Sequence, residues 1–274
     1  MEDLKQTIIS YSSKDLEQRK NWYSPAAEAY NKARPRYPQH LINQVVEVTQ
    51  LSSKSKILEV GCGPATATVA FAQLGSSMIC LEPNPDFFQL AQHNCQPYAN
   101  VKIENTSFEE WALDTLEFDA VLAASSFHWI SPEVGYTKAA NALKAGGYLI
   151  LLWNKELQPS YKVYQRLSEV YQLYAPFLDR YEDKETQENI LRGLGSFVID
   201  SGKFSDLRFR QITSEVSYTV DEYLMLLNTY SPYLKLDPQI KDALFAALRQ
   251  RIEDEFQGSL QLAYISAFHI AQKL

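Results

Sequence analysis

Two glycines and an acidic residue give the strongest chemical signal in this sequence. Gly61 and Gly63 follow an apolar run that ends at Val60, and a helical stretch is expected from Pro64. Glycines between a strand and a helix let bare backbone N–H groups approach a ligand at the carboxyl edge of a sheet. Glu82 ends the next β-type run about 20 residues later, where a carboxylate can accept hydrogen bonds from both hydroxyls of a ribose. This spacing indicates a site for a nucleotide-like cofactor.

Two kinds of nucleotide site share this geometry. The dinucleotide fingerprint G-x-G-x-x-G places a third glycine where this chain has Thr66. Pro64 also removes one N–H donor at the start of the helix, where a pyrophosphate would bind. A nicotinamide-dependent dehydrogenase therefore stays open only as a weaker alternative. The same residues also allow a tight structural turn without a ligand.

The elements that would position these residues alternate along the chain. From 56 to about 154, short β-branched runs alternate with helical stretches, which is typical of βαβ units and a parallel sheet. We expect strands at 56–62, 77–83, 101–106, 118–125 and 147–154, and helices at 64–74, 84–95 and from 132 to a glycine stop at 146 and 147.

The pattern changes after residue 154. Amphipathic helices rich in Tyr and Leu are expected at 159–177 and 184–194, an antiparallel strand at 207–219, a helical block at 221–256 and a last strand at 260–272. We therefore divide the chain into an N-terminal arm or lid at 1–38, a cofactor-binding core at 39–154, a helical cap insertion at 155–205, and the last core strands with second cap helices at 206–274. The first twenty or so residues are polar and unpatterned, as in a disordered segment or a loose flap.

Composition narrows the class of protein. The 274 residues carry a net charge of -7, which repels phosphate backbones and disfavours a nucleic acid partner. No apolar run approaches the roughly 20 residues of a membrane span, and the N-terminus lacks a signal sequence, so we expect a cytoplasmic protein without a membrane span. The three cysteines and four histidines show no disulfide or metal-ligand spacing, so we expect no metal. The sequence does not indicate an oligomeric state.

Taken together, these motifs resemble a known family. Glu59-x-Gly61-x-Gly63, Glu82 and the run Phe118-Asp119-Ala120-Val121 are similar to class I S-adenosylmethionine-dependent methyltransferases. Further motifs are similar to the small-molecule branch that includes trans-aconitate and ubiquinone-type methyltransferases: Tyr30-x-x-x-Arg34-Pro35-x-Tyr37-Pro38, Ser126-Phe127-His128-Trp129 and Thr229-Tyr230-Ser231. The resemblance implies an α/β fold, a Rossmann-like seven-stranded, mostly parallel sheet with an antiparallel last strand, plus a helical lid.

The resemblance also implies the cofactor, S-adenosyl-L-methionine, and the residues around it. Where the family often has another glycine this chain has Ala65, whose methyl group would crowd the methionine end. The cofactor-binding residues implied are Tyr30, Arg34, Glu59, Gly61, Cys62, Gly63, Glu82, Pro83, Asn84, Ser107, Phe108 and Ser125.

On the acceptor side, His128 is the candidate catalytic residue. It follows a hydrophobic strand, and we keep three roles open: a half-buried structural histidine, a group that orients the acceptor, or a general base. Candidate acceptor contacts are Tyr37, Trp129, Trp153 and Tyr230. We expect methyl transfer to an O, N or C atom of a small molecule. A cofactor-binding protein without catalysis remains the alternative.

The N-terminal segment with Tyr30, Arg34 and Tyr37 is expected to close over the cofactor together with Tyr230. Arg34 has a planar fork of donors suited to a carboxylate, either of the cofactor or of an acidic acceptor. The alternative is that Arg34-Pro35 sets a rigid start for the helix that begins near Gln39.

Overall fold

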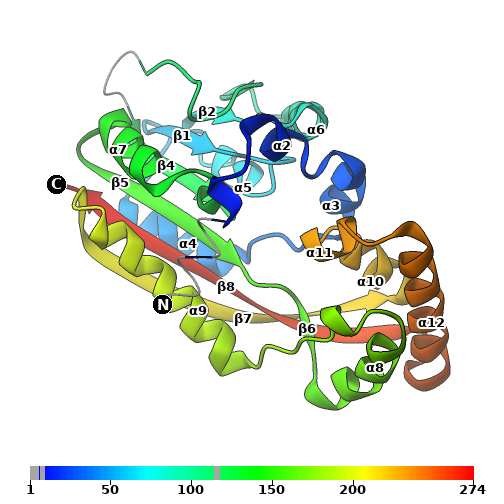
Figure 1. The fold of residues 1–274 in the computed structure, drawn as a ribbon. Coiled ribbons are helices and arrows are strands. Elements are labelled where there is room, and N and C mark those ends of the chain that lie inside the picture. Colours follow the sequence, from blue (N-terminus) through cyan, green and yellow to red (C-terminus); the bar gives the residue numbers. More distant parts are fainter. Residues whose placement is uncertain (1–5, 7–9, 114–117) are drawn as a thin grey trace.

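The computed structural model describes residues 6, 10–113 and 118–274, and an eight-stranded sheet forms its centre (Figure 1). Five parallel strands lie in the order β3-β2-β1-β4-β5, and β8 pairs antiparallel with β5. β7 pairs with the opposite edge of β8. The strands are β1 (Lys56–Val60), β2 (Ser77–Leu81), β3 (Val101–Glu104), β4 (Phe118–Ala124), β5 (Leu143–Asn154), β7 (Phe204–Thr219) and β8 (Ser259–Lys273).

The Rossmann-like, mostly parallel sheet with an antiparallel last strand is confirmed, but its strand count is eight and not seven. The extra strand is β6 (Gln158–Pro159), which pairs with Ala263 and Leu262 of β8. These pairs lie just beyond the last β5 pair, between Asn154 and Ser266. β6 therefore continues the line of β5 along the same edge of the long strand β8.

Helices cover both faces of the sheet (Figure 1). On one face α4 (Gln39–Thr49), α5 (Thr68–Ala72) and α6 (Pro85–Cys95) share a core with Ile150 and Leu152 of β5. On the other, α7 (Pro132–Ala142) and α9 (Lys184–Asp200) share a core with Leu149, Leu151 and Trp153. Successive side chains of a strand point to opposite faces, which explains this division of β5.

A second group of helices gathers at one end of β7 and β8 (Figure 1). It consists of α8 (Tyr161–Tyr174), η3 (Pro176–Leu178), α10 (Val220–Leu227), α11 (Ser231–Leu234) and α12 (Pro238–Phe256). Leu167, Leu224 and Leu248 belong to a separate apolar cluster in this group, which we call the cap. The helix α9 was expected beside α8 in a cap insertion, yet it packs against β7 and β8.

Several element boundaries differ from those expected. α5 begins at Thr68 and not at residue 64, because the chain first makes a turn in which Ala65 has a φ of 67°. α7 ends at Ala142, since Leu143 already pairs with Phe118 at the start of β5. In the N-terminal segment, α2 (Leu16–Asn21) stands at the end of the stretch of about twenty residues that was expected to be disordered or a flap, and η1 (Ser24–Ala26) and α3 (Ala27–Ala33) follow it. That expectation also covers residues 1–5 and 7–9, which lie outside the described residues.

Within the described part of the chain, no helix combines the length and the apolar composition that crossing a membrane requires.

Candidate active site

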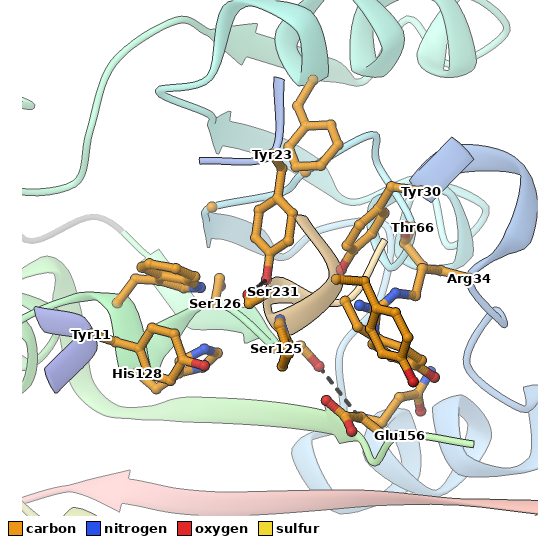
Figure 2. A pocket seen from close by; sticks show the side chains of 18 of the residues that line it. Tyr11, Tyr23, Tyr30, Arg34, Thr66, Ser125, Ser126, His128, Glu156 and Ser231 are labelled. Atoms are coloured by element: carbon orange, nitrogen blue, oxygen red, sulfur yellow. Dashed lines mark hydrogen bonds between the residues drawn. The ribbon is translucent and has the colours of Figure 1, made fainter. Parts of the chain in front are cut away.

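A cavity of about 950 Å³ opens at the carboxyl ends of β1, β2, β4 and β5. Parallel strands collect their carboxyl ends at one edge, which is where ligands bind in open α/β sheets. The N-terminal segment and the cap complete its walls (Figure 2). Most of the residues singled out in the sequence line it: Tyr30, Arg34, Tyr37, Gly61, Cys62, Gly63, Glu82, Pro83, Asn84, Ser107, Phe108, Ser125, His128, Trp129 and Tyr230.

The carboxylate of Glu82 joins the glycine turn to the end of β2. Its Oε2 accepts a hydrogen bond from the Gly63 N–H at 2.7 Å, and its Oε1 accepts one from the Asn84 N–H at 2.8 Å. Burial raises the pKa of Glu82 to about 7, against the opposing effect of these two hydrogen bonds. Each carboxylate oxygen keeps further acceptor capacity toward the cavity.

The turn after β1 needs left-handed backbone at three positions. Gly61, Gly63 and Ala65 have φ values of 66°, 57° and 67°. A Cβ on Gly61 would lie 2.8 Å from the Cβ of Ser126, whereas a Cβ on Gly63 would meet nothing within 4 Å. Gly63 therefore borders open space inside the cavity. Ala65 holds a conformation that glycine adopts without strain, and this gives a physical reason for the family's glycine at that position.

Glu59 does not line the cavity; it lies fully buried behind the turn. Its Oε2 accepts hydrogen bonds from Thr68 Oγ1 at 2.6 Å and from Cys80 Sγ at 3.6 Å. Oε1 has no partner among the described residues, and burial raises the pKa of Glu59 to about 7. Glu59 thus ties the turn to α5 and β2.

Cys62 is buried beside the turn, and burial raises the pKa of its thiol well above the ordinary value. A thiol in that state is a poor nucleophile, so Cys62 is a small packing residue of the loop.

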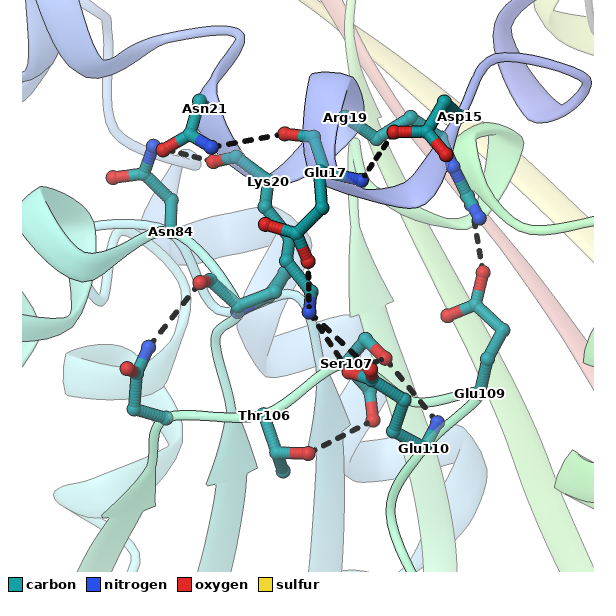
Figure 3. Close-up of polar contacts among 12 residues, drawn as sticks. Asp15, Glu17, Arg19, Lys20, Asn21, Asn84, Thr106, Ser107, Glu109 and Glu110 are labelled. Carbon is teal, nitrogen blue, oxygen red and sulfur yellow. Dashed lines mark hydrogen bonds and ion pairs between the residues drawn. The ribbon is translucent and has the colours of Figure 1, made fainter.

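Polar contacts hold α2 against the loops that follow β2 and β3 (Figure 3). Lys20 donates to Glu110, and Ser107 Oγ donates to Glu110 Oε2 at 2.8 Å. The Asn84 side chain donates to the Lys20 carbonyl at 2.6 Å while capping α6. On the other side of α2, Arg19 donates to Glu109 at 2.7 Å. The N-terminal segment is therefore bonded to the sheet edge.

The same segment is bonded to the cap. Trp22 Nε1 donates to Ser231 Oγ at 3.0 Å, and the Tyr23 hydroxyl lies 3.3 Å from that oxygen. The Tyr23 ring stacks on Phe87, with centroids 5.9 Å apart. Figure 2 shows Tyr23 and Tyr30 above Ser125 in the pocket. Residues 10–37 thus form a strap that spans the cavity from α6 to α11.

Arg34 is a half-buried cation that lines the cavity. Its Nε donates to Thr229 Oγ1 at 2.8 Å and its Nη2 to the Thr229 carbonyl at 2.9 Å. The guanidinium carbon lies 4.1 Å from the Tyr230 ring centroid and 4.9 Å from that of Tyr30. Within the described residues it has no carboxylate partner, so an anion at the cavity side would complete its bonding.

Ser125 ends β4 in a left-handed conformation, with a φ of 54°. Its Oγ lies 2.9 Å from the Tyr37 hydroxyl and accepts a hydrogen bond from the Asn154 N–H at 3.3 Å. A strained residue held by two neighbours at a sheet edge is typical of a ligand site.

His128 lines the cavity within a group of aromatic rings. Its ring centroid lies 5.5 Å from Tyr11, 5.6 Å from Trp129 and 5.9 Å from Trp153. Burial lowers the pKa of His128 to about 4, and no hydrogen bond of the imidazole is found within the described residues. A group with this pKa is mostly neutral at pH 7 and a weak general base.

Trp153 was expected at the acceptor but faces the opposite side of the sheet from Asn154. Its Nε1 donates to Nδ1 of the buried His269 at 3.1 Å. It lines a separate small cavity of about 20 Å³ and not the large one. Strand alternation places it there, because only every second residue of β5 points the same way.

Two groups of cavity residues carried no sequence signal. Tyr11, Arg19 and Tyr23 belong to the polar, unpatterned N-terminus, and their roles arise from long-range contacts. Glu156 follows β5 in a loop without a motif. Within the described residues no group of three or more His, Cys, Asp or Glu side chains is arranged to hold a metal ion.

Comparison with known proteins identifies a methyltransferase domain in this chain. Residues 57–147 match the family model described as a methyltransferase domain. An uncharacterized methyltransferase of Mycobacterium tuberculosis is 28% identical over 132 residues, covering 48% of this chain and 51% of that protein. The mitochondrial ubiquinone biosynthesis O-methyltransferase of Bos taurus is 36% identical over 115 residues, covering 40% of this chain and 31% of that protein. Residues 57–147 therefore form a methyltransferase domain, and the comparisons support the class I S-adenosylmethionine-dependent family for it.

A solved structure of a methyltransferase has a similar fold. A solved structure from Anaeromyxobacter dehalogenans, assigned to the type II methyltransferases, is similar with a TM-score of 0.66 at 17% identity, covering 87% of this chain and 97% of that one. The chain spans about half the length of the first curated relatives it matches. The match of residues 57–147 to a methyltransferase domain disfavours the alternative of a nicotinamide-dependent dehydrogenase.

The residues present fit the family's cofactor, S-adenosylmethionine. Open space beside Gly63 lets a ligand approach the backbone of the turn. Both oxygens of the buried Glu82 point to the same edge as that turn, and Arg34 offers a cation without a carboxylate partner among the described residues. A ribose diol and a carboxylate are the groups that such donors and acceptors bind.

Proposed function

We propose that this methyltransferase transfers the methyl group of S-adenosylmethionine to a small-molecule acceptor. One observation carries the proposal: the cavity that contains Gly63 and Glu82 continues past Ser125 into the cap, where Tyr171 and Leu236 line it. The cavity therefore has room for a second molecule beyond the cofactor. This room supports catalysis over the alternative of a cofactor-binding protein without catalysis.

We assign the cofactor end to the turn and the strap. Glu82 would hold the ribose hydroxyls, with Pro83, Asn84, Ser107 and Phe108 beside the adenine. Tyr30 and Arg34 would close over the methionine part, where the guanidinium pairs with its carboxylate. Gly61, Cys62 and Ser125 would shape this end, supported from behind by Glu59.

When bound, the cofactor supplies a methyl group on a positively charged sulfur. The protein has to hold the acceptor in line with that methyl group and exclude water. Aromatic faces suit a cation, and Tyr30, Tyr37, Trp129 and Tyr230 line the cavity. These residues would therefore contribute by positioning the acceptor and excluding water.

The net charge of -7 and the enclosure by strap and cap support a small molecule over a nucleic acid. Calorimetry with S-adenosylhomocysteine and with NAD tests the cofactor, and release of S-adenosylhomocysteine in the presence of an acceptor panel tests turnover. Binding of NAD in preference to S-adenosylhomocysteine would refute the proposal. Binding of S-adenosylhomocysteine without turnover on any acceptor would favour the non-catalytic alternative.

A further inference from the structure

Glu156 is a carboxylate in the cavity that the cofactor does not need. It lies between the end of β5 and the short strand β6, and its side chain lines the cavity. The carboxylate has no hydrogen bond or ion pair within the described residues, whereas the neighbouring Lys155 pairs with Glu182 at 2.7 Å. In Figure 2 the side chain of Glu156 lies below Ser125, and those of Tyr23 and Tyr30 lie above.

The backbone around Glu156 is fixed on both sides. Its carbonyl accepts a hydrogen bond from Nε2 of the buried Gln187 at 3.1 Å. The next N–H, of Leu157, donates to the Tyr230 hydroxyl at 3.2 Å, and the N–H of Lys155 donates to the Ile265 carbonyl at 2.9 Å. These bonds fix the position from which the Glu156 side chain enters the cavity, while its χ angles stay free to adapt to a ligand.

The carboxylate faces the junction between the cofactor end and the cap. Its charge acts on Arg34, Tyr230 and Tyr233. We have assigned Arg34 to the cofactor, and its guanidinium lies against the Tyr230 ring. Glu156 is therefore a charged group at this junction whose carboxylate has no ion pair within the described residues.

Beyond this junction the cap offers apolar surface. The hydroxyls of Tyr171 and Tyr233 bond to each other at 2.7 Å, so their rings remain as apolar walls. Leu167 and Leu227 lie deeper, and Phe177 and Ile240 at the mouth are 72% and 40% exposed. An apolar lining that continues from the interior to the mouth fits a ligand with an extended apolar body.

We propose that Glu156 is the catalytic carboxylate for an acceptor that carries an O–H or N–H group on an apolar body lying in the cap. The inference rests on the proposed methyl transfer. A lone pair of the acceptor oxygen or nitrogen forms the new bond to the methyl carbon, the carbon–sulfur bond breaks, and its electron pair stays on sulfur. The acceptor's proton passes to the Glu156 carboxylate.

This assignment also selects against another class of acceptor. A carboxylate acceptor in the cap would meet the charge of Glu156, whose side chain is exposed to the cavity, and the two like charges would repel. The weak basicity of His128 agrees with a different proton acceptor, since burial lowers the pKa of His128 to about 4.

Three probes with one apolar body test the proposal. We would measure the binding of 4-hexylphenol, 4-hexylanisole and 4-hexylbenzoate by calorimetry at saturating S-adenosylhomocysteine. The proteins are the native chain, Glu156→Ala, Glu156→Gln and the control Glu47→Gln, which removes an exposed carboxylate on α4 outside the cavity. A titration with S-adenosylhomocysteine alone tests the proposed function separately and shows that each variant is folded.

We expect the native chain and Glu47→Gln to bind the phenol at least about tenfold more tightly than the anisole or the benzoate, since a hydrogen bond to a charged group contributes about that factor or more. Glu156→Ala should abolish the preference over the anisole and leave S-adenosylhomocysteine affinity unchanged, and Glu156→Gln should strengthen benzoate binding. With a phenol that turns over, Glu156→Ala should lower kcat by roughly 100-fold or more.

The inference is wrong if the benzoate binds best to the native chain, if the phenol preference survives in Glu156→Ala, or if S-adenosylhomocysteine binds but none of the three probes does. Failure of S-adenosylhomocysteine itself to bind overturns the proposed function, and the inference with it.

Discussion

The N–H of Gly63 donates to Oε2 of Glu82 across 2.7 Å, so the turn after β1 and the acid after β2 form one unit. The two parallel strands are adjacent, with Val60 paired to Leu81, and this register brings the two ends together. A change in Glu82 therefore affects both the shape of the turn and the contacts that we assign to the ribose.

We expect Glu82→Ala to weaken S-adenosylhomocysteine binding by about 30-fold or more, because charge-assisted hydrogen bonds contribute roughly 1.5–3 kcal/mol each. Calorimetry measures the affinity. The control is Glu47→Gln on α4, which removes an exposed carboxylate outside the cavity. An unchanged affinity in folded Glu82→Ala would remove the ribose assignment.

The two turn glycines should respond differently to alanine. In Gly61→Ala the new Cβ would lie 2.8 Å from the Ser126 Cβ, so strain and a clash should lower the free energy of unfolding by about 2 kcal/mol or more. In Gly63→Ala only backbone strain of about 1 kcal/mol is expected, but the methyl group enters the cavity and should weaken S-adenosylhomocysteine binding. Denaturant unfolding and calorimetry separate the two effects. Native affinity in Gly63→Ala would show that the cofactor does not approach this turn.

Burial of Glu59 should make stability depend on pH. Its pKa in the folded state is raised to about 7 from an ordinary value of 4.5, so the folded state binds more protons between these values. The stability of the native chain that depends on a protonated Glu59 is therefore fully present below pH 4.5 and is lost as the pH rises to about 7. Glu59→Gln should therefore gain stability relative to the native chain between pH 5 and pH 8, by up to about 3 kcal/mol. Urea unfolding at both pH values measures this, and a pH-independent difference would contradict it.

The strap should loosen when its bond to the cap is removed. Ser231→Ala removes the acceptor of Trp22 Nε1 and the partner of the Tyr23 hydroxyl, and each such bond contributes about 1 kcal/mol. We expect faster hydrogen exchange across 16–33 and weaker S-adenosylhomocysteine binding by about three- to tenfold. Ser217→Ala on β7, where the side chain is exposed, is the control. Slow exchange that does not respond to Ser231→Ala or to ligand would indicate a static arm.

His128→Asn should lower turnover by less than about tenfold, because a residue with a pKa lowered to about 4 contributes little as a base at pH 7. Kinetics with a working acceptor measure the change. A loss of 100-fold or more at unchanged cofactor affinity would instead support His128 as the base.

The sequence predicted the strands and the cofactor end of the site because their signals are local. Gly61, Gly63 and Glu82 stand at fixed distances from strand ends, and the parallel sheet brings those ends to one edge. The two-residue strand β6 has no pattern of its own and exists because the edge of β8 beyond β5 is available for pairing.

The acceptor end depends on contacts between distant segments. Glu156 acquires its place from Gln187 and Tyr230, which no local spacing reveals. Trp153 was assigned to the acceptor because it ends an apolar run, but alternation in β5 turns it toward His269. The strap was not predicted in detail because its partners Glu109 and Ser231 lie 90 and 209 residues away from Arg19 and Trp22, respectively.

The strand β8 also sets the order in which a growing chain can fold. It pairs with β5 on one edge and with β7 on the other, and it supplies Phe268 and Ile270 to the core beneath the parallel strands. During synthesis the sheet cannot be completed until residues 259–273 have left the ribosome. Until then the nascent protein exposes the open edge of β5, which can pair with a strand of another chain.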